Sequence, residues 1–222
     1  MTGRLSVLIF YFAIFVLSTI SHASDYTFRA GQIFCLGKPF RINDPLSWYA
    51  QWTKWMQQDR GEPETRDLWH CGLIVSPSQM LEVTGFSFNA LKLSPTENIL
   101  KIKDRNVVVY DLPLTDKERK KVTQTAWDTY YRGRVPFNHL VIIGLTLSNL
   151  GNKTGLWPHW GWAERNIRYG FICPEFVAYC FSSIGLYFKP GMDWWKGTTT
   201  DDIDDYCLKN AEIVYQKLGG IR

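Results

Sequence analysis

The sequence predicts an α+β domain in which helices pack on an antiparallel sheet, and three observations support this fold class. Strand-like runs lie mainly in the first half of the chain, a short turn joins two of them, and helical segments dominate the second half. The chain has 222 residues, of which 45% are hydrophobic and 15% aromatic, so it can bury one sizeable core. No internal repeat and no linker marks a second domain. We therefore expect a single domain.

The first 23 residues have the pattern of a secretory signal peptide. Arg4 gives this segment a positive charge, the run from Leu5 to Ile20 is uncharged and apolar, and small residues precede a cleavage site after Ala23. The apolar run has 16 residues, fewer than the roughly 20 that span a bilayer. We therefore favour cleavage over an uncleaved N-terminal membrane anchor. The single domain is expected to comprise residues 24–222 and to be exported, either to a periplasm or out of the cell.

Short strands are expected in the first half of the mature chain, each bounded by turn residues. The first is Gly31–Leu36. The runs Leu68–Val75 and Gln79–Thr84 are separated by a Ser-Pro-Ser turn, which predicts a β-hairpin. Asn106–Tyr110 is rich in valine, a residue typical of strands. Between the first strand and the hairpin, the aromatic-rich segment Leu46–Gln58 has the spacing of a helix.

Capping signals locate the helices of the second half. Thr115 and Glu118 form a capping box at the start of one helix, which we expect to end at Gly133. Cys173–Ile184 is a second helix, with a proline in its first turn, where proline is tolerated. A short last helix is expected over Thr200–Leu208, capped by its first residue.

Composition argues against several classes of function. The formal net charge is +4, only 21% of the residues are charged, and the basic residues are scattered among acidic ones. This is not the pattern of a nucleic-acid binder, so no nucleic-acid partner is expected. The aspartates at Asp201, Asp202, Asp204 and Asp205 lack the glycine and distal glutamate of an EF-hand loop, and acidic residues at a helix start explain them better. Neither a metal ion nor a cofactor is expected.

Cys173 is the candidate nucleophile. A reactive thiol needs a lowered pKa, which a helix N-terminus and a neighbouring imidazole can both provide. Cys173 lies immediately before Pro174 at the start of a predicted helix. Unsatisfied backbone N–H groups there favour a thiolate and could hold a developing oxyanion. The alternative is a buried structural cysteine, because a free cysteine packs as a small hydrophobic residue.

His70 is the candidate base and Glu82 the candidate orienting acid. Of the four histidines, only His70 lies inside a predicted strand, where alternation places it on one face with Leu68, Gly72 and Ile74. Glu82 lies on the next strand of the hairpin. A register that turns Glu82 toward His70 would orient the imidazole and fix its tautomer. The alternatives are a satisfied core histidine and an ordinary solvent-facing glutamate.

The order of these motifs resembles a known superfamily. The segments that carry the likeness are Gly31–Phe34, Trp69–Val75, Met80–Val83, Tyr131–Phe137 and Tyr169–Val177. In this order they resemble the opening Gly-Asp strand, the His-x-Gly-Ile strand, the acid-bearing strand, the Gly-x-x-Tyr-Asp segment and the Tyr-x-Cys-Ser-Glu-Leu-Val helix start of the NlpC/P60 superfamily. The YaeF/YiiX-like amidase group of these permuted papain-like enzymes is the most similar. The likeness spans roughly residues 30–208.

The chain departs from the family pattern at four positions. Gln32 stands where the family has aspartate, Pro174 stands where it has serine, and Phe137-Asn138 stands where Tyr-Asp is common. The proline removes a hydroxyl and an N–H group near the thiol, so the oxyanion site is expected to differ. Glu175 is interpreted as an acid that complements the helix dipole rather than as a catalyst.

The resemblance implies a circularly permuted papain-like fold with a catalytic triad of Cys173, His70 and Glu82. It also implies an exported cysteine hydrolase that cleaves amide or ester bonds of peptidoglycan peptides or of lipids. Ten tryptophans and a mild positive charge would suit contact with a membrane surface or an anionic polymer. Two alternatives stay open: an acyltransferase that uses the same triad, and a non-catalytic cell-envelope binding module on the same scaffold.

The other cysteines could form disulfides in an oxidising compartment. Cys35 and Cys71 could meet on adjacent strands, and Cys180 could meet Cys207 between the last two helices, which leaves Cys173 free. No Cys-x-x-Cys spacing is present, so a structural zinc site is not expected.

Overall fold

The structure is a computed structural model, and it describes residues 26–37, 43, 68–84, 89–103, 105–139, 142–144, 147, 170–189, 191 and 195–217. The predicted signal peptide and the predicted helix Leu46–Gln58 lie outside these residues. Within them, no helix is both long and apolar enough to cross a membrane.

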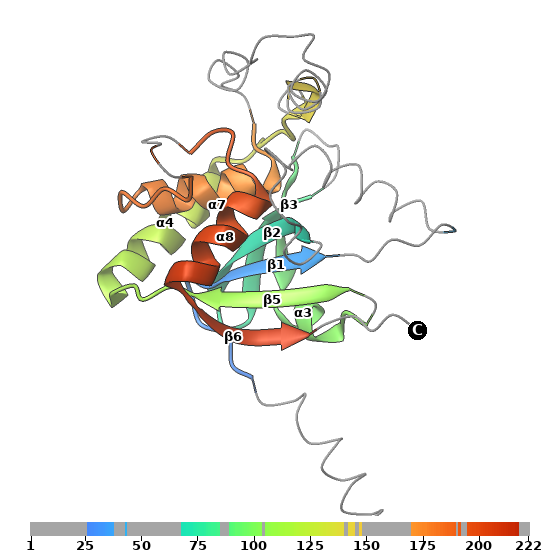
Figure 1. The fold of residues 1–222 in the computed structure, drawn as a ribbon. Coiled ribbons are helices and arrows are strands. Elements are labelled where there is room, and N and C mark those ends of the chain that lie inside the picture. Colours follow the sequence, from blue (N-terminus) through green and yellow to red (C-terminus); the bar gives the residue numbers. More distant parts are fainter. Residues whose placement is uncertain are drawn as a thin grey trace, which may run out of the picture.

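The described residues form an α+β structure, as the sequence predicts, with an antiparallel sheet of six strands and helices packed on it (Figure 1). The elements in chain order are β1 (Ile33–Gly37), β2 (Leu68–Ser76), β3 (Gln79–Val83), β4 (Leu91–Pro95), α3 (Glu97–Lys101), β5 (Asn106–Asp111), α4 (Asp116–Arg132), α7 (Cys173–Ser182), α8 (Thr200–Asn210) and β6 (Glu212–Lys217). The strand order in the sheet is β4-β3-β2-β1-β5-β6. The predicted hairpin is therefore β2 and β3, near the middle of the sheet.

The caps of the helices follow from their sequences. The Thr115 side chain accepts a hydrogen bond from the N–H of Glu118, and the Glu118 carboxylate accepts one from the N–H of Thr115, so the predicted capping box starts α4. The prediction that Thr200 caps the last helix is wrong by one residue. Thr199 is the cap, because its hydroxyl accepts from the N–H of Asp202 at 3.1 Å and the Asp202 carboxylate accepts from its N–H at 2.8 Å.

Two hydrophobic clusters lie on opposite faces of the sheet. The larger one fills the space between the sheet and the layer of α4, α7 and α8, which Figure 1 shows on one side of the strands. Within it, α7 packs on β2 and β3, while α4 and α8 pack on β2. The smaller cluster on the other face includes Phe34, Ile74 and Ile99, the last of which comes from α3. The start of α7, with Cys173, is thus held against the hairpin that carries His70.

An irregularity in the register of β1 and β2 lies beside His70. Leu36 is the partner of His70, but the next residue, Gly37, is the partner of Leu68, so Trp69 is an extra residue in β2. Such a bulge breaks the alternation of side chains along a strand. The prediction that Leu68 shares a face with Ile74 is therefore wrong: Leu68 lies in the cluster under the helices, and Ile74 lies in the opposite one.

Candidate active site

The hairpin brings His70 and Glu82 together. Glu82 is the register partner of Gly72, two residues from His70, so both side chains lie near the same end of the β2–β3 ladder. His70 Nε2 lies 2.8 Å from Glu82 Oε2, and both side chains are largely buried. Because the carboxylate engages Nε2, the other ring nitrogen, Nδ1, is left to face a third group.

The second oxygen of Glu82 is held by a residue that the sequence did not point to. The hydroxyl of Ser94, on β4, donates a hydrogen bond to Glu82 Oε1 at 3.0 Å. The carboxylate is therefore fixed at both oxygens, one by the imidazole and one by the hydroxyl. Ser94 could be found only if β4 had been predicted, and the alternation of Leu91 and Leu93 was the signal for that strand.

Gly72 makes room for the ring that supports His70. A Cβ atom at this glycine would lie 2.5 Å from the Phe34 ring and 2.8 Å from the backbone oxygen of Leu81. The Phe34 ring occupies that space, and its centroid lies 6.2 Å from that of His70 in an edge-to-face arrangement. The absence of a side chain at Gly72 thus lets an aromatic residue of β1 pack beside the imidazole.

Cys173 is the first residue of α7, and a buried carboxylate fixes this helix start. Glu175, which has no exposed surface, accepts hydrogen bonds from the N–H of Ile172 at 3.2 Å and from the N–H of Gly197 at 3.1 Å. It therefore ties the residue before Cys173 to the segment that leads into α8. Its predicted first-turn position is confirmed, and the structure adds this bracing contact.

The Cys173 sulfur is in contact with both His70 and Cys71. The side chain and backbone N–H of Cys71 hydrogen-bond to it, and so does the side chain of His70. Cys71 points into the cluster beneath the helices, where α7 packs on β2. Cys173 itself is 9% exposed and His70 6%, so both residues lie at the edge of the core.

These contacts shift the pKa values of the two groups in opposite directions. The hydrogen bond from Cys71 lowers the pKa of Cys173, burial opposes this, and the charge and hydrogen bond of His70 lower it further, so the pKa lies well below the ordinary 9.0. Burial alone would lower the pKa of His70, but Cys173 and Glu82 together raise it to about 10. The favoured form at neutral pH is a thiolate–imidazolium pair.

Glu82 is ionised in the same range of pH. Burial would raise its pKa, but the hydrogen bond and charge of His70, the hydroxyl of Ser94 and the charge of Arg105 lower it below the ordinary 4.5. The imidazolium therefore lies between two anionic groups, the carboxylate on one side and the thiolate on the other.

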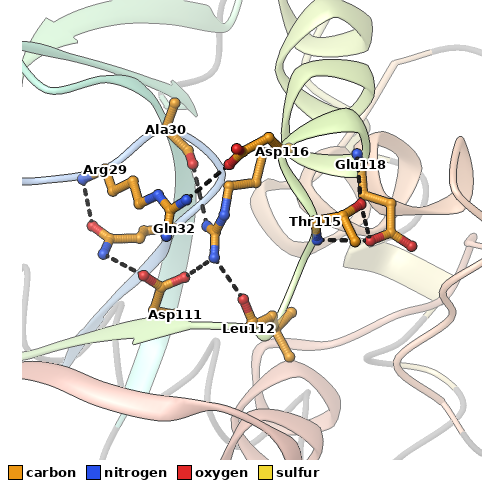
Figure 2. Close-up of polar contacts among 9 residues, drawn as sticks. Arg29, Ala30, Gln32, Asp111, Leu112, Thr115, Asp116 and Glu118 are labelled. Carbon is orange, nitrogen blue, oxygen red and sulfur yellow. Dashed lines mark hydrogen bonds and ion pairs between the residues drawn. The ribbon is translucent and has the colours of Figure 1, made fainter.

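Gln32, which precedes β1, lies at the other end of this strand from the partner of His70. Its amide donates to Asp111 at 3.0 Å, and its oxygen accepts from the N–H of Arg29 at 2.8 Å (Figure 2). The amide also donates to the Tyr26 hydroxyl at 2.9 Å. The partner of His70 in β1 is Leu36. Gln32 therefore has a structural role and cannot donate to an oxyanion at Cys173.

The other acids and cysteines do not form a metal centre among the residues described. No group of three or more histidine, cysteine, aspartate or glutamate side chains there could hold a metal ion. All five cysteines are free and buried. Cys35 and Cys71 are register partners on β1 and β2, as predicted, but neither this pair nor Cys180 and Cys207 forms the disulfide that the sequence suggested.

In comparisons with known proteins, the chain matches no family model, no curated protein and no solved structure.

Proposed function

We propose that this chain is a cysteine hydrolase of the permuted papain-like type, which cleaves amide or ester bonds through Cys173, His70 and Glu82. The observation that carries the proposal is the chain of contacts from a sulfur at a helix start, through an imidazole, to a carboxylate. Nucleophile–base–orienter arrangements of this kind are the general device for acyl transfer. The order of the motifs, with the histidine strand before the cysteine helix, supports the permuted papain-like architecture.

The mechanism follows from the charges of the pair. The Cys173 thiolate attacks the carbonyl carbon of an amide or ester, and a tetrahedral oxyanion forms. The His70 imidazolium, held by Glu82 through Nε2, gives a proton to the leaving group, and an acyl–sulfur bond remains. His70, now neutral, takes a proton from water, which attacks the acyl group and releases the acid and the thiolate.

The oxyanion site has fewer backbone donors than a helix start without proline. Pro174, next to the nucleophile, has no N–H, so the N–H of Cys173 is the first-turn donor nearest the sulfur. One oriented donor of this kind contributes about 10²–10³ in rate. The substrate class that we propose is a peptidoglycan peptide or a lipid amide or ester, encountered after export, and no cofactor takes part in the steps above.

The experiment is a competition between cysteines of one chain for limiting iodoacetamide, with the modified residues identified by mass spectrometry from pH 4 to 9. Cys180 is the internal reference, because it lies on the same helix and burial alone raises its pKa. We expect Cys173 to be alkylated selectively at pH 6, and His70→Gln to slow this at least tenfold. Equal, slow labelling of both cysteines would contradict the proposal and favour a non-catalytic binding module.

The same protein is then assayed with fatty-acyl nitrophenyl esters, fatty-acyl amides and soluble peptidoglycan fragments. Cys173→Ala should lower the rate by about a thousandfold or more. For the wild type, kcat/KM should rise as Cys173 loses its proton, below pH 9.0, and fall as His70 loses its proton near pH 10. The falling limb should be absent from alkylation, which needs only the thiolate. Added amine or alcohol acceptors distinguish hydrolysis from acyl transfer by the product formed.

A further inference from the structure

We propose that Cys71 is a resolving thiol for Cys173, so that a peroxide converts the two cysteines into a reversible Cys71–Cys173 disulfide. The inference goes beyond acyl transfer, since it requires a reactive sulfur at Cys173 but no substrate.

The fold places the two sulfurs in contact from separate elements. Cys71 follows His70 in β2 and points toward the helices, and Cys173 begins α7, which packs on that strand. Both the side chain and the backbone N–H of Cys71 hydrogen-bond to the Cys173 sulfur. Hydrogen-bonded sulfur atoms need only a small movement to reach the bond length of a disulfide, about 2.05 Å.

Exposure assigns different roles to the two cysteines. Cys173 is 9% exposed and Cys71 is fully buried behind it. Cys173 therefore presents a small accessible surface to a peroxide, whereas Cys71 presents none. The thiolate is also the form that peroxides oxidise, and redox-sensitive cysteines are typically placed next to a resolving cysteine.

The two steps balance without any other reactant. In the first, the Cys173 thiolate attacks one peroxide oxygen, the O–O bond breaks, and a sulfenic acid and hydroxide form; the His70 imidazolium protonates the hydroxide to water. In the second, the Cys71 sulfur attacks the Cys173 sulfur, the S–O bond breaks and the S–S bond forms. The departing hydroxide takes the Cys71 proton and leaves as water. Two thiols are oxidised by two electrons, and one hydrogen peroxide is reduced to two waters.

The electrostatics of the pair fit this order of events. Burial raises the pKa of Cys71, and its contacts with the anionic Cys173 and with Cys35 raise it further. When Cys173 becomes a neutral sulfenic acid, that negative charge is removed. The Cys71 thiol is therefore easier to deprotonate at the step in which it must attack.

Cys35 provides a matched control. It is as fully buried as Cys71, is its register partner and contacts its side chain, so it could form a disulfide with Cys71 instead. It lies on β1, however, one strand farther from the sheet region on which α7 packs. Cys180 is seven residues beyond Cys173 on a straight helix, about 10 Å away, so it cannot resolve the same sulfur.

The test treats the reduced full-length protein with stoichiometric hydrogen peroxide, blocks free thiols with iodoacetamide and maps peptides without reduction. We expect a Cys71–Cys173 disulfide peptide, loss of Cys173 alkylation, and full recovery with dithiothreitol. Cys71→Ser should abolish the disulfide and let Cys173 proceed to sulfinic acid, which dithiothreitol does not reverse. Cys35→Ser should behave as the wild type.

Two results would overturn the proposal: sulfinic acid at Cys173 with Cys71 still free in the wild type, or a Cys35–Cys71 disulfide that leaves Cys173 reduced. The wild-type disulfide peptide decides the matter even if Cys71→Ser folds poorly, which thermal unfolding would reveal. The peroxide experiment reads only thiol chemistry. A disulfide without any hydrolysis would therefore refute the proposed function alone, and hydrolysis without a disulfide would refute this inference alone.

Discussion

A buried polar cluster lies at each end of β1, and the two clusters differ in the group at which the chain of hydrogen bonds stops. At the start of the strand, Gln32, Asp111 and Arg119 form the network that Figure 2 shows. Near its other end, opposite Leu36, lie His70 and its partners Glu82 and Cys173. Both clusters combine a carboxylate with a cation, so composition alone does not distinguish them.

Fixed acceptors hold the two terminal nitrogens of the Arg119 guanidinium. The guanidinium donates to Asp111 Oδ1 at 2.6 Å and to the backbone oxygens of Leu112 at 2.8 Å and Ala30 at 3.3 Å. The other oxygen of Asp111 accepts from Gln32. One positive charge faces one negative charge, and no sulfur is part of this network.

The cluster around His70 ends on a sulfur. Two groups that become anionic, Glu82 and Cys173, share one imidazolium. A buried polar cluster therefore becomes a candidate for chemistry when its last member can gain or lose a proton and can form a bond. The comparison assigns stability to the first cluster and reactivity to the second.

The strongest way to break this comparison is Arg119→Met. The change leaves the Asp111 carboxylate without its partner in a site where the two side chains are 16% and 8% exposed. Breaking a largely buried pair costs about 3–5 kcal/mol, so the midpoint of urea unfolding should fall strongly. The selectivity of iodoacetamide for Cys173 at pH 6 should be unchanged in the protein that remains folded. A lost selectivity with normal stability would mean that the two clusters are not separate.

Gly72→Ala should have the next largest effect, and it should affect both properties. The new Cβ would meet the Phe34 ring and the backbone oxygen of Leu81, which cannot both move away cheaply. We expect a loss of about 1–3 kcal/mol in the free energy of unfolding, as for other overpacked positions, together with slower Cys173 alkylation. Gly133→Ala is the control for a glycine change away from His70: it has open space around it but a φ of +65°, so it should lower stability through backbone strain without slowing alkylation. Unchanged stability and alkylation in Gly72→Ala would show that the hairpin is looser than the contacts indicate.

Glu82→Gln tests the comparison in the cluster around His70. The amide oxygen can still accept a hydrogen bond from His70, but the negative charge that raises the pKa of His70 is removed. The imidazolium is then less stable, the pKa of Cys173 rises, and alkylation at pH 6 should slow by about tenfold, which corresponds to about 1.4 kcal/mol. Asp111→Asn is the matched control and should lower stability without slowing alkylation. The reverse pattern in the two variants would contradict the assignment.

Ser94→Ala should give the smallest change. It removes the hydroxyl that holds Glu82 Oε1 at 3.0 Å and lowers the pKa of that carboxyl. The lost hydrogen bond joins a hydroxyl to a carboxylate that is partly exposed, so its loss should cost about 1 kcal/mol or less. Alkylation and kcat should therefore each fall twofold to fivefold. Ser94→Thr keeps the hydroxyl and should restore both rates. Equal rates in all three proteins would show that Glu82 needs no second contact.

Local signals explain what could be predicted from the sequence. β1, the β2–β3 hairpin, α4 and α7 carry turn residues, caps or apolar periodicity within their own segments, and each lies within two residues of its predicted bounds. By contrast, β4 and β6 are short edge strands with several exposed positions, and the alternation of Leu91 and Leu93 is only a weak signal for the first of them. The helix α3 has five residues and no periodic stripe to detect.

The same distinction applies to the site. Cys173, His70 and Glu82 were selected from their own elements, and the structure brings them together. Ser94 depends on β4, and the bulge at Trp69 depends on how two strands pair, so neither is a property of one segment. The contact between Cys71 and the Cys173 sulfur could not be predicted from the sequence. Alternation places Cys71 on the face opposite His70, and only the docking of α7 on β2 brings the two cysteines together.

The wide separation of the site residues in the chain has a consequence for the time at which the site forms. More than a hundred residues lie between His70 and Cys173, and Glu175 further ties the helix start to Gly197, near the end of the chain. During synthesis, the histidine strand emerges long before the cysteine helix, and the bracing segment emerges later still. Until α7 docks on β2, Cys173 is a thiol of ordinary acidity, with neither the imidazole nor Cys71 beside it. Cys173 of a nascent or unfolded chain should therefore react slowly with iodoacetamide. The alkylation rate of this sulfur then measures the fraction of molecules that have completed their tertiary structure.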